Sequence, residues 1–140
     1  MRLLVTGSGG FIGARLAKHL LNLGHEVMDY DIVTGQDLMN FQQLSNAVQN
    51  SDVVFHIAAA VDLNWVKEYP YDATIINVGS THNVVHLCAK HNKRLIYAST
   101  VCVYGNQEKH PETEENLPNP SELYACTKYA GEWIVRGYGY

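Results

Sequence analysis

The sequence predicts an α/β fold of the Rossmann type, a doubly wound parallel sheet, and three observations lead to this prediction. A short apolar run that begins at Leu3 enters a glycine-rich turn at residues 7–13, and a helical pattern follows directly. Apolar runs and helical patterns then alternate along the chain, as they do in consecutive βαβ units. Residues 53–57 form an apolar run of the kind that a parallel strand covered on both faces shows.

We expect one domain that covers residues 1–140. A chain of 140 residues with 46% hydrophobic residues is long enough to bury one core. The expected elements are, in chain order, a strand beginning at Leu3, a helix over residues 15–23, a strand over 26–30, a short extended piece over 32–38, a helix over 41–49, a strand over 53–57, a long helix from Tyr69-Pro70 to Ala89, a strand over 94–98, an exposed turn-rich loop over 105–120 and a helix from Ser121 to Arg136.

Several elements begin or end at residues that commonly start or stop helices. Asn40 and Ser121 are expected to cap the helices that follow them. Gly24 and Gly137 are expected to end the first and the last helix, because glycine readily adopts the left-handed conformation found after a helix.

Three glycines in the first turn predict a phosphate-binding site. Gly7, Gly10 and Gly13 are three residues apart at a junction between a strand and a helix, where a dinucleotide pyrophosphate binds. The first glycine allows a tight turn, the second lets the phosphates approach the backbone, and the third lets the helix pack closely on the strand. A side chain at Gly10 should therefore block the phosphates. The alternative is a glycine-rich turn with a purely structural purpose.

Asp31 is the predicted ribose-binding acid. It ends the second strand 18 residues after Gly13, close to the spacing of about 20 residues expected for that role. A carboxylate there would repel the additional phosphate of NADP, and no arginine follows Asp31 directly, so the predicted cofactor is NAD. The alternative is an aspartate that caps a turn at the end of a strand.

Tyr124, Lys128 and Thr100 are the predicted catalytic residues. Tyr124 and Lys128 are four residues apart, hence on the same face of the last helix. A free tyrosine has a pKa of about 10, and a nearby ammonium and a positively charged nicotinamide would stabilise its phenolate. Thr100 follows the fourth strand at the sheet edge where ligands bind in open α/β folds. The alternatives are a solvated helix face and hydroxyls that satisfy strand-end backbone groups, a description that fits Ser99 better.

Composition and charge exclude several classes of partner. The net charge is −4, the isoelectric point is near 5.9, and the chain has no run of basic residues, so we expect neither nucleic acid nor an anionic membrane as partner. The first apolar run is cut by Thr6 and Gly7, which excludes a secretory signal, and no segment reaches transmembrane length. The odd number of cysteines, without a CxxC pair, suits a reducing compartment, so a cytoplasmic location is expected.

No metal site is predicted. His82 and His86 are four residues apart on a helix, but the sequence offers them no evident third ligand, so a solvated helix face is the better interpretation. His56 ends a buried strand and is expected to be a hydrogen-bonded core histidine. Cys102 is expected to be a small core residue.

Four motifs, taken in order, resemble the extended short-chain dehydrogenase/reductase family, specifically its NAD-dependent nucleotide-sugar epimerases and dehydratases. These motifs are TGSGGFIG, DVVFHIAA, STVCVYG and YACTK. The resemblance implies that the pyrophosphate lies on the glycines, the ribose on Asp31 and the adenine beside Asp37 and Leu38. It implies that Thr100 assists, that Tyr124 is the acid/base, and that Lys128 binds the nicotinamide ribose and tunes Tyr124. The cofactor-binding residues that it implies are Gly7, Gly10, Phe11, Ile12, Gly13, Asp31, Asp37, Leu38, Ala58, Ala59, Tyr124 and Lys128.

The resemblance favours an epimerase that transiently oxidises a sugar carbon of a nucleotide sugar, similar to UDP-glucose/galactose 4-epimerase. Dehydratases commonly place Asp-Glu after the catalytic threonine, whereas this chain has Val101-Cys102. The alternatives are a dehydratase, an NAD-dependent dehydrogenase of a hydroxy-steroid or another alcohol, and a non-enzymatic NAD-binding module. The family also implies a homodimer through the helices at residues 72–91 and 122–136.

Members of this family are about twice as long as this chain. The resemblance therefore implies that the sheet is truncated before its last strands and that the carboxyl-terminal substrate lobe is absent. We accordingly expect these 140 residues alone to be poorly active.

Overall fold

A computed structural model describes residues 1–107 and 111–140. Residues 108–110, which belong to the loop predicted over 105–120, lie outside the described residues. The strands are β1 (Arg2–Thr6), β2 (Glu26–Tyr30), β3 (Val53–His56) and β4 (Arg94–Tyr97). The helices are α1 (Phe11–Asn22), α2 (Phe41–Gln49), α3 (Leu63–Glu68), α4 (Pro70–Thr74), α5 (Ser80–Lys90) and α6 (Leu123–Gly137), with 3-10 helices η1 (Ile32–Thr34) and η3 (Val101–Tyr104) and the π-helix η2 (Ile75–Gly79).

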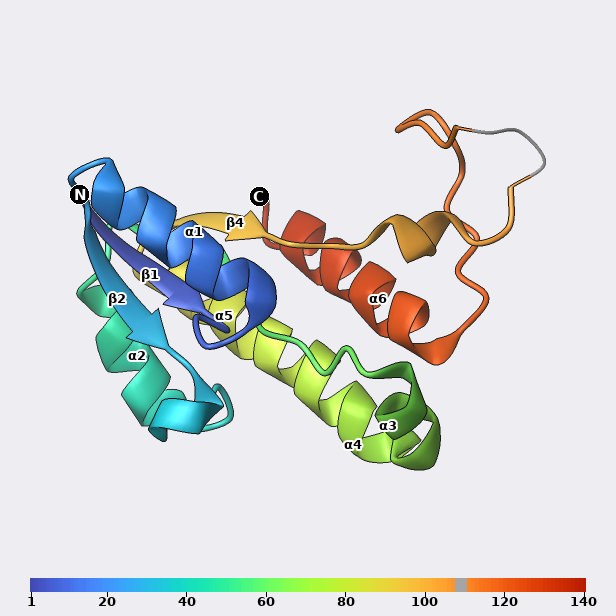
Figure 1. Ribbon diagram of the computed structural model, residues 1–140, viewed down its shortest axis with the longest axis horizontal. Helices are drawn as coiled ribbons and strands as arrows, with labels where there is room; N and C mark the ends of the chain where they lie inside the picture. Colours follow the sequence, from blue (N-terminus) through green and yellow to red (C-terminus); the bar gives the residue numbers. More distant parts are fainter. Residues whose placement is uncertain (108–110) are drawn as a thin grey trace.

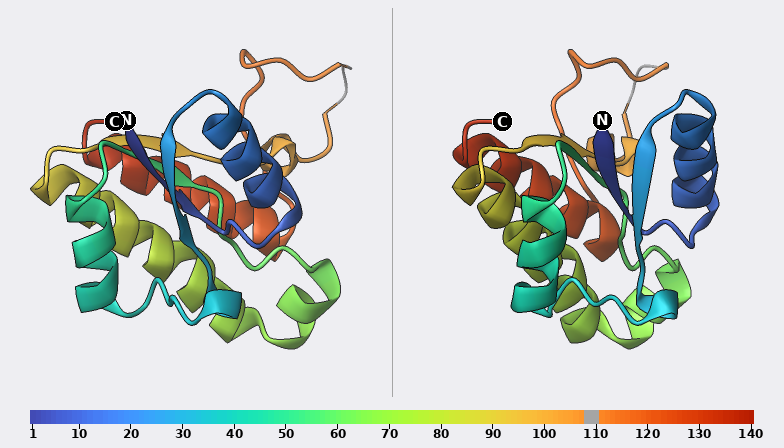
Figure 2. Two further views of the ribbon diagram at one scale, coloured as in Figure 1. Left: turned by 60° about the vertical axis from the view of Figure 1, so that its left-hand side comes forward. Right: turned by 90° about the vertical axis from the view of Figure 1, so that its left-hand side faces the viewer.

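The four strands form one parallel sheet in the order β2-β1-β3-β4. Helix α1 lies on one face of this sheet, while α2 and α5 lie on the other (Figure 1, Figure 2). Helix α6 packs beside α5. This arrangement confirms the predicted α/β fold with a doubly wound parallel sheet, in which β4 is an edge strand.

The core has two parts because side chains of β1 alternate between the faces of the sheet. Leu4 faces the larger cluster, which contains Tyr30, Leu44, Val48, Val54, Val84, Leu87 and Cys88. Leu3 and Val5 point the other way and pack with Val53 and with Leu20 of α1. Val54 of β3 lies in the larger cluster and Val53 in the smaller one, so both faces of β3 are buried, as the apolar pattern of residues 53–57 predicted.

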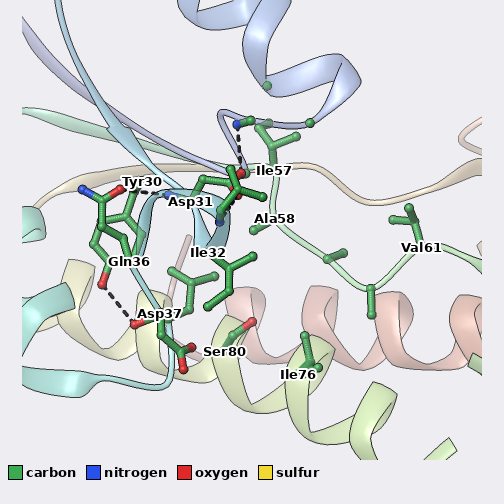
Figure 3. A pocket seen from close by; sticks show the side chains of 18 of the residues that line it. Tyr30, Asp31, Ile32, Gln36, Asp37, Ile57, Ala58, Val61, Ile76 and Ser80 are labelled. Atoms are coloured by element: carbon green, nitrogen blue, oxygen red, sulfur yellow. Dashed lines mark hydrogen bonds between the residues drawn. The ribbon is translucent and has the colours of Figure 1, made fainter. Parts of the chain in front are cut away.

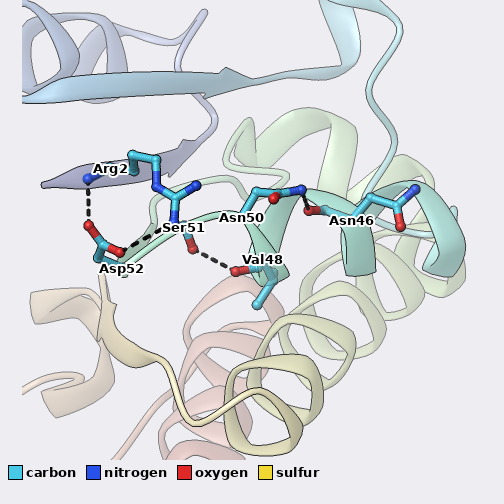
Figure 4. Close-up of polar contacts among 6 residues, drawn as sticks. All are labelled: Arg2, Asn46, Val48, Asn50, Ser51 and Asp52. Carbon is cyan, nitrogen blue, oxygen red and sulfur yellow. Dashed lines mark hydrogen bonds and ion pairs between the residues drawn. The ribbon is translucent and has the colours of Figure 1, made fainter.

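Polar contacts fasten the amino ends of the central strands, at the edge opposite the glycine turn. The Arg2 amide donates to the Asp52 carboxylate at 2.7 Å, and the Arg2 guanidinium lies 3.8 Å from the same group (Figure 4). The Ser51 hydroxyl donates to the Val48 carbonyl at 2.8 Å, which closes the end of α2. These bonds help to fix the register in which Leu3 lies opposite Val53.

The long helix predicted from Tyr69-Pro70 consists of three parts. Pro70 begins α4, where its missing N–H is tolerated, and the chain then passes through the π-helix η2 into α5. The π-helical turn places Asn77 in the interior, where its carbonyl accepts the Thr81 hydroxyl at 2.6 Å. The sequence predicted the start of this helix but not the π-helical turn inside it.

Four local predictions were wrong, and a side chain explains two of them. Gly137 is still part of α6, and the left-handed glycine after this helix is Gly139. Residues 32–38 are not extended, because Asp31 caps the turn of η1 by accepting the Val33 amide at 3.0 Å. The cap of α6 is Glu122 rather than Ser121, because the carboxylate of the longer Glu122 side chain accepts the amides of Tyr124 and Ala125. Cys102 is exposed on η3 rather than buried.

The prediction also missed α3, which Asp62 caps by accepting the amides of Asn64 and Trp65. The predicted cap at Asn40 is confirmed, because its side chain accepts the Gln43 amide at 3.1 Å. Within residues 1–107 and 111–140, the structure contains no helix long and apolar enough to cross a membrane.

Candidate functional site

The loops that leave β1, β2 and β3 meet at the carboxyl edge of the sheet and enclose a cleft of about 740 Å³ (Figure 3). Open α/β sheets bind their ligands at this edge. Ten residues predicted to bind cofactor line the cleft, namely Gly7, Gly10, Phe11, Ile12, Gly13, Asp31, Asp37, Leu38, Ala58 and Ala59. The structure therefore brings together residues that are up to 52 positions apart in the sequence, Gly7 and Ala59 being the outermost.

The three glycines of the turn meet different neighbours. Gly7 has a φ of +73° and would place a Cβ 2.8 Å from the backbone of Ala58, so the fold itself requires glycine there. A Cβ on Gly13 would overlap the Gly7 carbonyl oxygen. A Cβ on Gly10 would lie 3.3 Å from the same oxygen, which is tight but tolerable, so the fold requires glycine least at this position. Gly10 is also the N-cap of α1, the helix end that favours anions.

Asp31 holds the glycine turn against the end of β2. One carboxylate oxygen accepts the Gly9 amide at 2.8 Å, and the other accepts the Val33 amide at 3.0 Å. Asp31 thus caps a turn, as the alternative interpretation proposed, and it also lines the cleft. A carboxylate has about four lone-pair sites, so two backbone bonds leave capacity for ribose hydroxyls.

Apolar side chains form the far wall of the cleft. Ile32 is 67% exposed and Val33 is 78% exposed, and both lie just after the end of β2. Ile76 of η2 and Ser80 of α5 approach from the helix below (Figure 3). Such a wall suits a flat aromatic ring bordered by a few polar groups.

The sequence interpretation missed eleven residues that line the cleft. These are Gly9, Tyr30, Ile32, Val33, Gln36, Met39, Ile57, Ala60, Val61, Ile76 and Ser80. Most are neighbours of residues that were predicted, so continuing along each loop would have found them. Ile76 and Ser80 gave no such signal, because only the packing of the α4–α5 segment beneath the sheet brings them to the cleft.

A buried hydrogen-bond network supports the loop that follows β3. His56 Nδ1 lies 2.8 Å from the Thr6 hydroxyl, and His56 Nε2 lies 3.0 Å from the Thr81 hydroxyl. Thr81 donates its single proton to the Asn77 carbonyl, so Nε2 of His56 is the donor and Nδ1 the acceptor. Burial, and then the nearby charge of Lys128, lowers the pKa of His56 to about 3. This confirms the prediction of a hydrogen-bonded core histidine.

Asn77 joins the cleft to α6. Its amide oxygen accepts the Ala60 amide at 2.7 Å, and its amide nitrogen donates to the Ala60 carbonyl at 3.1 Å and to the Thr127 hydroxyl at 3.0 Å. Ala60 lines the cleft, and Thr127 precedes Lys128. The wall of the cleft and the helix that carries Lys128 are therefore held in a fixed relation.

Thr100, Tyr124 and Lys128 do not line this cleft, but two of them are in contact. A side-chain hydrogen bond joins Thr100 to Tyr124. The pKa of Tyr124 is raised by burial, while the bond from Thr100 lowers it and Cys102 and Glu122 raise it further. Thr100 also accepts the Cys102 amide at 3.3 Å and so caps η3. The strand-end capping that the sequence assigned to Ser99 therefore belongs to Thr100.

Lys128 is buried, with 2% of its surface exposed. Its Nζ lies 4.3 Å from the centre of the Tyr97 ring, a cation–π contact. Burial lowers the pKa of Lys128 to about 8, and Glu132 opposes this change. The lowering of the Tyr124 pKa by Lys128 together with the nicotinamide stays a prediction.

The two histidines of α5 are not simply solvated. His82 Nε2 lies 3.0 Å and His86 Nδ1 lies 3.3 Å from the Tyr138 hydroxyl, so both rings fasten the end of α6. Within the part of the chain that the structure describes, no group of three or more His, Cys, Asp or Glu residues could hold a metal ion.

The family model for the NAD dependent epimerase/dehydratase family matches residues 3–140. The chain belongs to this family. Membership confirms the predicted resemblance and the predicted cofactor, since the family is NAD-dependent by its description. The residues of this chain fit an NAD cofactor. Gly7 and Gly13 leave no room for a Cβ in the glycine turn, and Asp31 lines the cleft beside it.

Relatives of the chain include both epimerases and dehydrogenases. A 3-beta-hydroxysteroid dehydrogenase of Mycolicibacterium neoaurum is 34% identical over 97% of this chain and 43% of that protein. A UDP-glucose 4-epimerase of Mycolicibacterium smegmatis is 29% identical over 99% of this chain and 51% of that protein. The chain thus spans about half the length of these curated relatives.

Solved structures of family members share the fold. The UDP-glucose 4-epimerase from Brucella ovis in complex with NAD has a TM-score of 0.92 and 26% identity, over 98% of this chain and 47% of that chain. The UDP-glucose 4-epimerase of Thermus thermophilus in complex with NAD has a TM-score of 0.90 and 29% identity, over 99% of this chain and 51% of that chain.

Proposed function

We propose that this chain is the NAD-binding and catalytic portion of an epimerase that acts on a nucleotide sugar by transient oxidation of a sugar carbon. The observation that carries the proposal is the contact between Thr100 and Tyr124. Buried Lys128 lies one helical turn from Tyr124 on α6. Asn77 joins this helix to the wall of the cleft. The cleft offers a site for the cofactor, and the pair offers a site for proton transfer. The similarity to several UDP-glucose 4-epimerases supports this reaction class.

The residues of the chain divide the work between binding and proton transfer. Gly7, Gly10 and Gly13 would receive the pyrophosphate at the N-terminus of α1, and Asp31 would accept hydrogen bonds from the adenosine ribose. Asp37 and Leu38 would border the adenine, and Phe11, Ile12, Ala58 and Ala59 would line the rest of the cofactor site. Bound NAD supplies a hydride acceptor and a positive charge beside the reacting centre.

Tyr124 is the proposed acid/base. Its phenol would exchange a proton with the sugar hydroxyl, and Thr100 would bond the same oxygen. Because burial raises the pKa of Tyr124 in the free chain, the phenolate needs positive charge in its surroundings. Lys128 would supply part of that charge and would bind the nicotinamide ribose.

A dehydrogenase of a hydroxy-steroid or another alcohol is the second candidate, favoured by the 34% identical relative. It would use the same three residues and release NADH in proportion to product, whereas an epimerase returns the hydride to its substrate. Incubation with NAD and either UDP-glucose or a 3-beta-hydroxysteroid, followed by NADH absorbance, separates the two.

A dehydratase is disfavoured because Val101-Cys102 provides no acid after Thr100. A non-enzymatic NAD-binding module would tolerate loss of Tyr124.

The partners and the location of the protein stay predictions. We expect a homodimer through the helices at residues 72–91 and 122–136, a nucleotide-sugar substrate and a cytoplasmic setting. Because the chain spans about half of its relatives, we expect slow turnover of a nucleotide sugar by these residues alone.

Titration of the chain with NAD and with NADP tests the proposed cofactor site. NAD should bind saturably and at least tenfold more tightly than NADP, a difference of about 1.4 kcal/mol. Asp31→Asn keeps the shape of the side chain but removes its charge, so the preference for NAD should shrink. Asp29→Asn, at an exposed position of β2 outside the cleft, is the matched control and should change nothing. A folded chain that binds neither nucleotide would refute the proposed site.

A further inference from the structure

Glu132 on α6 lies between two parts of the proposed catalytic group, the Ser99–Thr100 segment and Lys128. The Ser99 hydroxyl donates a hydrogen bond to its carboxylate, and Ser99 directly precedes Thr100. Glu132 also follows Lys128 by one helical turn, so the two side chains share a face of α6. One carboxylate therefore contacts the segment that follows β4 and lies one helical turn from the buried ammonium.

The surroundings of Lys128 contain few charges. The titratable groups near it are His56 and Tyr97 from the sheet, and Tyr124 and Glu132, which lie one helical turn away on either side of it on α6. The pKa of His56 is lowered to about 3, and those of Tyr97 and Tyr124 are raised, in each case chiefly by burial, so these three groups are uncharged at neutral pH. Glu132 is then the anion that the described structure brings to Lys128.

A buried ammonium needs such a partner. Removing an ammonium from water without compensation favours its neutral form. Burial brings the pKa of Lys128 down to about 8 even though Glu132 raises it. Loss of the Glu132 charge would lower the pKa of Lys128 further, so a larger fraction of the lysine would be neutral near pH 7.

We propose that Glu132 is a positioning residue that keeps Lys128 charged and holds the Ser99–Thr100 segment, which follows β4, against α6. This inference rests on the proposed function, because it assigns Glu132 to the same catalytic group. Glu132 acts through Lys128 and Thr100 and is not proposed to touch the substrate. Its loss should therefore change the pH at which Lys128 functions more than it changes the fold.

The test is an NMR titration of lysine side chains, labelled with ¹³C at Cε, in the chain without cofactor. Glu132→Gln preserves the shape of the side chain and an oxygen that can accept from Ser99, but removes the charge. The midpoint of Lys128 should fall by about one pH unit or more. Glu132→Asp, which keeps the charge, should restore most of the shift. Glu26→Gln, exposed on β2, is the control and should leave the midpoint unchanged. An unchanged midpoint in folded Glu132→Gln overturns the proposal.

Ser99→Ala provides the test if Glu132→Gln does not fold. It keeps both charges but frees the carboxylate to turn toward water, so the Lys128 midpoint should fall by less than in Glu132→Gln; no fall overturns the proposal.

NAD affinity gives an independent readout, because Glu132→Gln should weaken binding more at pH 8 than at pH 6. If the native chain binds no NAD while the midpoint still falls, the proposed function fails and the role of Glu132 in charging Lys128 stands. If NAD binds and the midpoint stays, only the inference about Glu132 fails.

Discussion

Gly10 and Gly13 belong to the same turn but are required for different physical reasons. A Cβ at Gly13 would overlap the Gly7 carbonyl oxygen, which is backbone and cannot move aside without disturbing the turn. A Cβ at Gly10 would lie 3.3 Å from that oxygen, and its backbone has a φ of −81°, which any residue adopts. The need for glycine at position 10 thus comes mainly from a ligand, and the need at position 13 comes from the fold.

Alanine at each position should separate these two requirements. Gly13→Ala should lower the free energy of unfolding by about 1–3 kcal/mol, as overpacking does. Gly10→Ala should cost about 1 kcal/mol or less, the usual penalty for a poor N-cap, yet weaken NAD binding at least tenfold. Urea denaturation and NAD titration of the two variants measure the contrast. Full NAD affinity in Gly10→Ala would show that the phosphates do not approach this residue.

Elements with strong local signals were predicted well. The bounds of β2 and α2 were predicted to the residue. Asp31 follows the strand directly and Asn40 caps the helix, and both residues are recognisable in the sequence. The π-helix η2 left none, because its Asn77 is held by Ala60 and Thr127, which lie far along the chain. The same reason hid the contact between Lys128 and Tyr97, so the glycine turn could be predicted from sequence but the setting of the lysine could not.

Helix α6 approaches β4 closely because Gly131 has no side chain. A Cβ at Gly131 would overlap the Tyr97 hydroxyl and lie 2.8 Å from Tyr97 Cζ. That hydroxyl donates to the Lys128 carbonyl at 3.1 Å, and the Tyr97 ring lies under the Lys128 ammonium. The contact between these two elements therefore sets the position of Lys128.

A double-mutant cycle tests this contact. Gly131→Ala should destabilise the chain by about 1–3 kcal/mol through overpacking. In a Tyr97→Phe background the same change should cost less, because the nearest atom is gone. Urea denaturation of the four proteins gives the coupling energy. Equal costs in both backgrounds would contradict the close approach of α6 and β4 that the structure shows.

The buried network around His56 joins most layers of the molecule. It runs from Thr6 on β1 through His56 on β3 to Thr81 on α5, and from there through Asn77 to the wall of the cleft and to α6. Both ring nitrogens are used, one as donor and one as acceptor, so the network requires neutral imidazole. Protonation of His56 should therefore loosen the whole molecule rather than one loop.

The pH dependence of folding follows from the pKa of His56, about 3 in the folded chain against an ordinary 6.5. Between these values the unfolded chain binds more protons than the folded chain, so the free energy of unfolding rises with pH. The contribution of His56 to stability is complete only above pH 6.5. It should be lost as pH falls toward 3, with a limiting slope of about 1.4 kcal/mol per pH unit.

Urea denaturation at closely spaced pH values measures this slope, and His56→Gln supplies the comparison. The variant should be less stable at pH 7, because it disturbs the network, but its stability should vary much less between pH 4.5 and 6.5. Asp52, whose pKa is lowered chiefly by its bond from the Arg2 amide, acts only below its ordinary value of 3.8, outside that interval. Equal slopes in the native chain and in His56→Gln would mean that His56 is not the group that makes the fold sensitive to acid.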